Sequence, residues 1–351
     1  MQKRSLLAGT TACVILAVCI TAAAGAQPIK VVATLSVYAD IARQIGAGRV
    51  EVEAIARGDE DAHFVKPKPS YALLLKKADL FVTTGLDLEM WAPVLVEKSG
   101  NKNIRDGQPG WVSASQGVVL LDIPASASRE AGDVHLFGNP HLHTSPIAAK
   151  RIAANIAAGL ERVDPAGAEL YRGQLESFRQ RLNEALYGAE LVTLFGAETL
   201  DNLARDGKLV SFLEGQELGG KPVLERLGGW LGKGLVFRGR EIIAYHKNWI
   251  YFTALFGLKV VDYVEPKPGI PPSARHVKEL IDEIAARDIK VLIAANYFDP
   301  QKPRTIAERT GCRDVVLPLG VGEGGAADYF ALVDRWVDSI AEAFAAAESE
   351  E

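Results

Sequence analysis

Residues 29–56 read IKVVATLSVYADIARQIGAGRVEVEAIA, and this stretch carries the pattern that decides the fold. Residues 29–34 form a run rich in β-branched side chains, which is typical of a buried strand. Residues 37–42 begin a helical periodicity that ends near Gly46, and residues 50–55 alternate between apolar and charged side chains. A strand, a helix and a second strand in so short a segment predict a βαβ unit with parallel strands.

The same alternation continues through the first half of the chain. After a loop at 57–70, we expect a helix at 70–77, a strand at 79–85 and a fourth strand at 117–121. Strands that alternate with helices form parallel sheets covered by those helices, so this half predicts an α/β lobe.

A long helical segment follows. Residues 146–190 have a helical pattern with a break at 163–165, where Asp164 can cap a helix and Pro165 can occupy its first turn. The helix after the break, 166–189, would be about 35 Å long at a rise of ~1.5 Å per residue. Such a helix is long enough to run along the outside of two lobes.

Strands and helices alternate again in the second half. The expected strands are 241–245, 260–264, 289–294 and 314–319, and the expected helices are 273–287, 303–310 and 327–347. Before them lies a stretch with ten glycines, 195–239. We expect it to be either an elaborated loop or a small hairpin that shapes the approach to a site.

Residues 1–26 have the pattern of an export signal. Lys3 and Arg4 precede an apolar run at 6–23, which ends in the small-residue triplet 24–26. This order is typical of a secretory signal peptide that is cleaved after the triplet. An uncleaved membrane anchor is less favoured, because the apolar run is at the short limit for a span. We therefore expect export to the periplasm.

The cysteines bear on anchoring and on disulfides. Cys19 has the outline of a lipid-attachment box, but Val18 stands where such boxes need a small residue, so a lipid anchor is the less favoured alternative. Cys13 and Cys19 leave with the signal peptide, and Cys312 alone remains. We expect no internal disulfide, so the hydrophobic cores must stabilise the exported protein.

The net charge of the chain bears on which kinds of molecule it can bind. Loss of the two basic residues of the signal changes the formal net charge from −5 to −7. A mildly acidic chain without a basic stripe argues against nucleic-acid binding. We expect a monomer.

The histidines carry the chemistry. The mature chain contains His63, His135, His141, His143, His246 and His276. His63 and His246 each follow a predicted strand, one in each half, and His141 lies just before the helix that starts at 146. Ligands of open parallel sheets bind outside the carboxyl ends of the strands, so these three side chains should converge across a cleft. Neutral imidazoles are donors that zinc favours, and a carboxylate or a water would complete a tetrahedral site.

Most single histidines in loops are solvated or hydrogen-bonded locally, and we assign His135 and His276 to that class. His143 stands two residues after His141 and would point to the same side of an extended segment. It is therefore either a chelating partner of His141 or a neighbour of the ligands.

Short motifs occur along almost the whole mature chain. They are Val31-Val32-Ala33-Thr34, Asp61-Ala62-His63, Pro67-Lys68-Pro69-Ser70, Lys77-Ala78-Asp79-Leu80-Phe81, Gly85-Leu86-Asp87-Leu88-Glu89, Asn139-Pro140-His141, Tyr245-His246-Lys247-Asn248-Trp249, Tyr251-Phe252, Phe256-Gly257-Leu258 and Glu265-Pro266-Lys267-Pro268-Gly269-Ile270-Pro271-Pro272-Ser273. Each motif is weak alone, but in this order and spacing the chain resembles the zinc- and manganese-binding solute receptors of bacterial ABC importers.

The resemblance implies an α/β fold of two βα lobes with parallel sheets, joined by a long rigid helix, with a metal site at the lobe interface. It implies His63, His141 and His246 as the first three metal ligands, and a membrane permease of an ABC importer as partner. The expected divisions are a signal peptide at 1–26, an N-terminal lobe at 27–163, a linking helix at 164–190 and a C-terminal lobe at 191–351, with a glycine-rich insertion near 195–239.

Two departures from the family pattern concern the fourth ligand. Many members have a tryptophan where this chain has His143, and many supply an aspartate where this chain has Leu317. Leu317 cannot bind a metal, so we expect water first, His143 second, and Asp299 or Glu323 third. A site without that carboxylate is dominated by nitrogen, which favours Zn²⁺ over Mn²⁺.

The sequence thus predicts a periplasmic receptor that captures a divalent metal, foremost Zn²⁺, and not an enzyme. The main alternative is a secreted zinc hydrolase, since three histidines and a water also describe a catalytic zinc. That enzyme would need a general base, but the chain has no His-Glu-x-x-His motif, and Glu60 and Asp61 are the obvious acids near His63. A second alternative is an adhesin that keeps the receptor fold.

Overall fold

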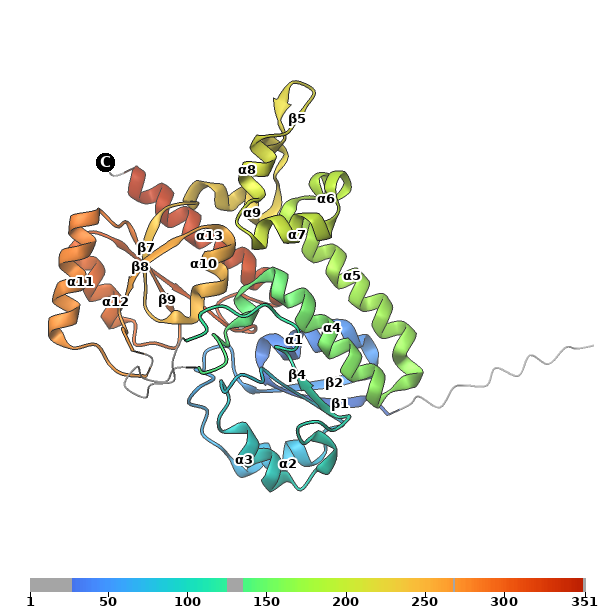
Figure 1. Ribbon diagram of the computed structural model, residues 1–351. Coiled ribbons are helices and arrows are strands. Elements are labelled where there is room, and N and C mark those ends of the chain that lie inside the picture. Colours follow the sequence, from blue (N-terminus) through green and yellow to red (C-terminus); the bar gives the residue numbers. More distant parts are fainter. Residues whose placement is uncertain (1–26, 125–134, 268, 350–351) are drawn as a thin grey trace, which may run out of the picture.

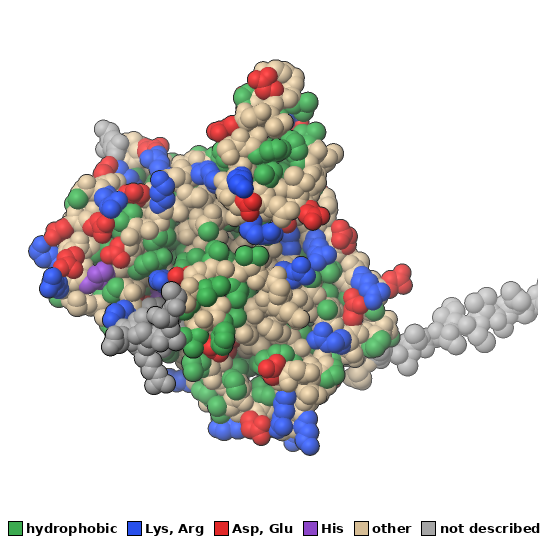
Figure 2. All heavy atoms as spheres, in the orientation of Figure 1, with side chains coloured by type: hydrophobic (Ala, Val, Ile, Leu, Met, Phe, Trp, Pro, Cys, Tyr) green, Lys and Arg blue, Asp and Glu red, His purple; other side chains and the backbone are tan. Residues whose placement is uncertain are grey.

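The computed structural model describes residues 27–124, 135–267 and 269–349. The predicted signal peptide, 1–26, lies outside the described residues. Among the residues that are described, no helix is both long enough and apolar enough to cross a lipid bilayer. Figure 2 shows acidic and basic side chains interspersed over the visible face of the molecule.

The first lobe is a parallel sheet with helices on its faces, as the opening stretch predicts. Its elements are β1 (Ile29–Leu35), α1 (Ser36–Gly46), β2 (Val50–Ala56), α2 (Pro69–Lys76), β3 (Leu80–Thr83), α3 (Ala92–Ser99) and β4 (Trp111–Ser113). The strand order is β2-β1-β3-β4, and every pairing is parallel. β1 lies in the interior of the sheet, and Val31 to Ala33 are almost completely buried, which explains why its sequence is continuously apolar.

The predicted fourth strand at 117–121 is wrong. The fourth strand is β4, which pairs with β3 through Phe81 and Trp111. Gly117 has a φ of 71° and turns the chain out of the sheet. The apolar residues that follow run towards the second lobe, where the Leu121 backbone N–H donates to the Tyr251 hydroxyl over 3.2 Å. The apolar side chains of this run are half-buried or exposed, and none of these residues pairs in a strand.

Two helices, α4 (Pro146–Val163) and α5 (Ala168–Tyr187), lead out of the first lobe. The break between them lies at the predicted place, where Asp164 ends α4 and accepts two hydrogen bonds from Arg49. With 20 residues, α5 is about 30 Å long. Figure 1 shows α5 on the outside of the molecule, running from the first lobe towards α6 (Ala189–Phe195).

The second lobe repeats the architecture of the first. Its elements are β7 (Glu241–Ala244), α10 (Ile250–Phe256), β8 (Lys259–Tyr263), α11 (Ala274–Arg287), β9 (Val291–Ala295), α12 (Gln301–Thr310), β10 (Arg313–Leu317) and α13 (Tyr329–Glu348). The order β10-β9-β7-β8 is again parallel. Counted in chain order within each lobe, both sheets have the order 2-1-3-4, so the shared rhythm of the two halves is a shared topology.

The glycine-rich stretch is mainly helical. Its helices are α7 (Ala197–Arg205), α8 (Leu209–Glu214) and α9 (Gly229–Lys233). Between α8 and α9 lies a short antiparallel hairpin, whose strands β5 (Glu217–Leu218) and β6 (Lys221–Pro222) have two residues each. In Figure 1 the hairpin projects from one end of the molecule. The expected hairpin therefore exists, but none of its residues lines the cavity beside the candidate site.

Hydrogen bonds at the joint hold the lobes against each other. The Val321 backbone N–H donates to Ser36 Oγ over 3.0 Å, and the Tyr329 backbone N–H donates to Asp40 Oδ2 over 2.9 Å. Gly320 lies so close to Gly58 that a Cβ added to Gly320 would be 2.4 Å from the Gly58 Cα. The carboxyl ends of both sheets thus face one narrow interface.

Candidate metal centre

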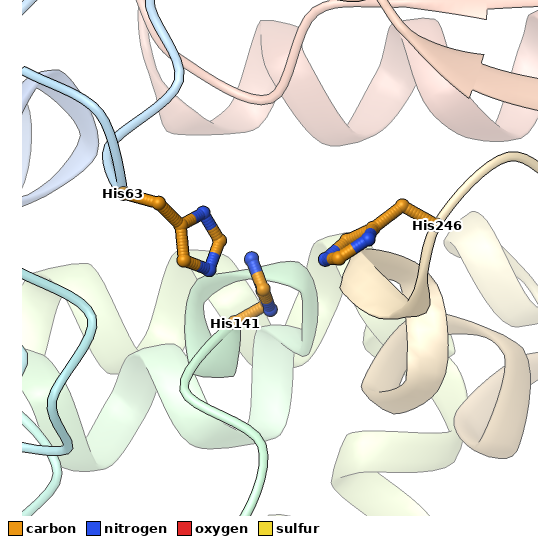
Figure 3. Close-up of side chains that lie close together, drawn as sticks. All are labelled: His63, His141 and His246. Carbon is orange, nitrogen blue, oxygen red and sulfur yellow. The ribbon is translucent and has the colours of Figure 1, made fainter. Parts of the chain in front are cut away.

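Three histidines meet at the interface between the lobes. One ligand nitrogen from each of His63, His141 and His246 lies within 4.8 Å of the others. His63 lies in the loop that follows β2, His141 precedes α4, and His246 follows β7. Figure 3 shows the three imidazoles approaching one another from separate segments. The structure therefore brings together the three residues that the positional argument and the resemblance selected.

Each of these imidazoles is oriented by an acceptor at its Nδ1 atom. The pairs are His63 with Asp61 Oδ1 at 2.7 Å, His141 with Asn139 Oδ1 at 3.0 Å, and His246 with Glu265 Oε2 at 2.8 Å. A carboxylate or amide oxygen can only accept, so the proton of each neutral ring is on Nδ1. The Nε2 atoms keep their lone pairs, which are what a metal ion needs.

Two of these acceptors follow from a local sequence pattern that the sequence analysis did not use. Asp61 and Asn139 each stand two residues before a ligand histidine, and each accepts both the backbone N–H and the Nδ1 proton of that histidine. Short polar side chains favour such local hydrogen bonds two residues on. The spacing Asx-x-His therefore signals an oriented imidazole. The third acceptor, Glu265, is distant in sequence from its histidine and has no such signal.

Asn139 also connects the two lobes. Its side-chain Nδ2 donates to the Lys247 carbonyl over 2.8 Å, and its own carbonyl accepts from the Tyr251 hydroxyl over 2.7 Å. Lys247 directly follows the ligand His246. One buried amide thus orients His141 and ties its loop to the segment that carries His246.

The protonation states suit metal binding. Burial, reinforced by the neighbouring histidines, lowers the pKa of His141 well below its usual value, so the ring is neutral. Burial raises the pKa of Asp61, but its hydrogen bonds and electrostatic contact with His63 outweigh burial and hold that pKa below its usual value. The centre therefore combines a neutral imidazole at His141 with a carboxylate behind His63.

His143 lies beside the three-histidine cluster. Its ring centroid is 6.4 Å from that of His141, and its buried Nδ1 atom has no hydrogen-bond partner among the described residues. Burial lowers the pKa of His143 to about 4. Of the two roles left open by the sequence, this placement favours the neighbour over the ligand.

The other candidates for the fourth position are not part of the cluster. Leu317 is buried at the end of β10. Asp299 is exposed and accepts the Gln301 backbone N–H, and Glu323 is half-buried. A cavity of about 30 Å³ lies against the cluster, lined by both lobes. It is large enough for the water that we ranked first.

His135, which the sequence analysis treated as an ordinary loop histidine, lies next to the cluster. Its Nε2 is 3.1 Å from His63 Nε2, and its ring centroid is 5.2 Å from that of His63 and 6.3 Å from that of His141. Burial and the nearby His63 and His246 lower the pKa of His135 to about 4. No pattern in the sequence indicates this contact, because 72 residues separate His63 from His135.

The chain is similar to known proteins of metal transport. Residues 31–187 and 224–343 match the family model described as zinc-uptake complex component A, periplasmic. The chain is 26% identical to the iron-binding protein YfeA of Yersinia pestis over 91% of this chain and 87% of the relative. It is 22% identical to the high-affinity zinc uptake system protein ZnuA of Bacillus subtilis, over 82% of this chain and 77% of that one. A manganese ABC transporter substrate-binding lipoprotein, PsaA of Streptococcus anginosus, is 27% identical over 55% of this chain and 58% of its own length.

Solved structures share the fold. A crystal structure of ZnuA superimposes with a TM-score of 0.64 at 19% identity, covering 91% of this chain and all of the other. The Mn-bound periplasmic metal binding protein from Candidatus Liberibacter asiaticus gives a TM-score of 0.63 at 17% identity, over 90% of this chain and 99% of its own.

Proposed function

This chain belongs to the family of periplasmic zinc-uptake components, the substrate-binding proteins of metal ABC transporters, and from that membership we propose that it captures Zn²⁺ and delivers it to a membrane permease. Capture of a divalent metal for an ABC importer follows from the family. The choice of zinc, the ligand set and the permease contact are the steps that we propose.

Family membership alone does not select the metal, because the relatives are named for iron, manganese and zinc. The single observation that favours zinc is the donor set. The clustered ligand atoms are imidazole nitrogens, and the carboxylates of Asp61 and Glu265 bind the far sides of two rings. Imidazole suits zinc, whereas manganese prefers carboxylate and water oxygens.

A receptor also fits the surroundings of the cluster better than a zinc hydrolase does. A hydrolase needs a general base beside the bound water. Asp61 instead accepts hydrogen bonds from His63, and Glu60 accepts from the Arg57 backbone. The family is one of receptors, in agreement with the prediction that the chain is not an enzyme.

The relatives leave the mode of anchoring open, since several are named lipoproteins. We propose a periplasmic protein released by cleavage after Ala26 and not held through Cys19. Mass spectrometry of the protein purified from the envelope tests this: an unmodified N-terminus at Gln27 is expected, and an acylated Cys19 would contradict it.

Metal titration of the mature protein tests the function. We expect Zn²⁺ to bind with a dissociation constant well below about 1 μM, and Mn²⁺ to compete poorly. The variants His63→Ala and His246→Ala should each weaken binding strongly, and His276→Ala, which removes an imidazole from α11, should not. Tighter binding of Mn²⁺ than of Zn²⁺ would overturn the choice of metal, and unchanged affinity in the His63→Ala/His246→Ala double variant would overturn the site.

A further inference from the structure

We propose that His135 is the fourth ligand of the bound metal, so that the position at which Leu317 offers no donor atom is filled by an imidazole from the loop before α4. This inference deepens the proposed function and rests on it. It gives the centre four nitrogen donors in place of three nitrogens and a water.

The first support is the position of His135 relative to the lone pair of His63. Asp61 holds the proton of His63 on Nδ1, so the Nε2 atom that lies 3.1 Å from His135 Nε2 is the metal-binding atom. Nitrogen ligands of a tetrahedral zinc, at ~2.0–2.1 Å from the metal, are about 3.3 Å apart. The two Nε2 atoms thus already have nearly the separation of two ligands of one ion.

Loading requires a change of tautomer at His135 and a small approach of its ring, because His135 is not among the residues whose ligand atoms all lie within 4.8 Å of one another. Without metal, the Nε2–H of His135 can donate to the unprotonated Nε2 of His63. When a metal takes the lone pair of His63, the proton of His135 moves through solvent to Nδ1. Its Nε2 lone pair then becomes available without any net change of charge.

The second support is the turn that brings His135 to the cluster. The His135 carbonyl accepts the Gly138 backbone N–H over 3.2 Å, and Asn139 follows directly. Gly138 has a φ of 117°, which L side chains rarely adopt, and an added Cβ would lie 3.1 Å from the Leu120 Cβ. This glycine therefore allows one tight turn to place His135 and the Asn139 that orients His141.

The competing histidine is less well placed. His143 is buried, and its Nδ1 atom has no hydrogen-bond partner among the described residues. Its ring contacts in the structure are with His141 and Tyr38, each at a centroid distance of 6.4 Å. His135 instead contacts both His63 and His141 and has a nitrogen at ligand distance from one of them.

X-ray absorption at the zinc edge of the loaded protein counts the imidazoles directly. We expect four imidazole nitrogens in the wild-type protein, three nitrogens and one oxygen in His135→Ala, and four in His143→Ala and His276→Ala. The zinc affinity of His135→Ala should fall about 10- to 100-fold, the range typical of lost support at metal sites. His135→Asp should recover affinity for Mn²⁺ relative to Zn²⁺, because it returns a carboxylate to the shell.

Three imidazoles and an oxygen in wild-type protein would overturn the inference, even if His135→Ala fails to fold. The loss of one imidazole in His143→Ala, with none lost in His135→Ala, would assign the position to His143. Either result leaves the proposed function intact, because the wild-type protein still binds zinc. A wild-type protein that binds no zinc would overturn the proposed function itself.

Discussion

At the scale of single residues, the centre depends on the acceptors behind the histidines. Asn139 makes two kinds of contact: it orients His141, and it donates to the Lys247 carbonyl of the other lobe. Replacing Asn139 tests whether zinc binding depends more on the orientation of His141 or on the hydrogen bond to Lys247.

Asn139→Ala should weaken zinc binding about 10- to 100-fold, because His141 loses the acceptor that fixes its tautomer. Asn139→Asp keeps that acceptor and loses only the donor to Lys247. It should therefore bind zinc more tightly than Asn139→Ala while losing a similar amount of folding stability. Competition with a zinc chelator gives the affinities, and denaturant titration of the metal-free proteins gives the stabilities. Equal affinities for the two variants would show that orientation of His141 is unimportant.

The second residue-scale prediction concerns His143 and pH. Burial lowers its pKa from 6.5 to about 4 in the folded protein. As pH falls below 6.5, the His143 ring becomes protonated in the unfolded chain but stays neutral in the folded protein. The free energy of unfolding therefore decreases between about pH 6.5 and about pH 4, and the contribution of the neutral ring is fully present above this window. A shift of this size corresponds to roughly 3 kcal/mol.

Metal-free wild-type protein and His143→Gln are the proteins to compare, since glutamine removes the titratable ring but keeps a polar side chain of similar size. The free energy of unfolding should fall less steeply with decreasing pH in His143→Gln than in wild type. Parallel pH profiles would mean that His143 is not a buried neutral group.

The residue scale also shows what the sequence can and cannot reveal. His63, His141 and His246 were predictable because their positions relative to strands and helices follow from periodicity and topology. Glu265 and His135 were not, because their contacts join segments whose separation depends on how loops pack. His135 belongs to a loop, and no periodic pattern indicates where a loop side chain points.

At the scale of helices and strands, a buried ion pair holds the glycine-rich segment in place. Lys150 of α4 contacts Asp201 of α7 over 2.6 Å, and the hydroxyl of Tyr187 of α5 donates to the same carboxylate oxygen. Burial, together with the nearby Arg179 and Arg205, lowers the pKa of Lys150 in spite of its contact with Asp201. The pair therefore joins three helices at a substantial desolvation cost.

Asp201→Asn should lower the free energy of unfolding by about 3–5 kcal/mol, because it leaves the Lys150 ammonium buried without its counter-charge. Lys150→Met combined with Asp201→Leu should recover much of that loss. Zinc affinity should be unchanged in both, since neither residue belongs to the cluster or its cavity. Urea titration and zinc competition provide the two readouts. A double variant less stable than Asp201→Asn would contradict this account.

The elements differ in how well the sequence predicted them. Strands β1, β2 and β3 and helices α5, α11 and α13 lie close to the predicted ranges, because each has a strong periodic pattern. The apolar run at 117–121 misled because its apolar side chains do not lie in a sheet: they are half-buried, and Val119 is 58% exposed. The short β4 has only three residues, too few to produce a pattern. Helices within 195–239 were hidden by glycines at their ends, such as Gly196 and Gly207, both with positive φ.

At the scale of the whole molecule, two lobes of the same 2-1-3-4 topology face each other with their carboxyl edges at one joint. His63 and His141 come from one lobe and His246 from the other, so the ligand geometry depends on how closely the lobes approach. The link through α5 and the hydrogen bonds at the joint favour small adjustments over a wide swing. Gly58 and Gly320, one from each lobe, set the closest approach of the backbones.

Gly320→Ala should therefore weaken zinc binding without touching a ligand. The added methyl group would lie 2.4 Å from the Gly58 Cα and 2.6 Å from Ser36 Oγ, so the lobes must separate slightly to admit it. Overpacking of this kind costs about 1–3 kcal/mol, which corresponds to a loss of about 5- to 150-fold in affinity if the strain is relieved by opening. Gly173→Ala in α5 is the matched control, because an added Cβ there meets nothing within 4 Å. That control should leave zinc affinity unchanged and, as a glycine-to-alanine change within a helix, raise the free energy of unfolding by up to about 1 kcal/mol.

Unaltered zinc affinity in Gly320→Ala, measured by chelator competition, would contradict this account. It would show that the interface between the lobes tolerates separation and that the three histidines do not depend on a fixed distance between the lobes.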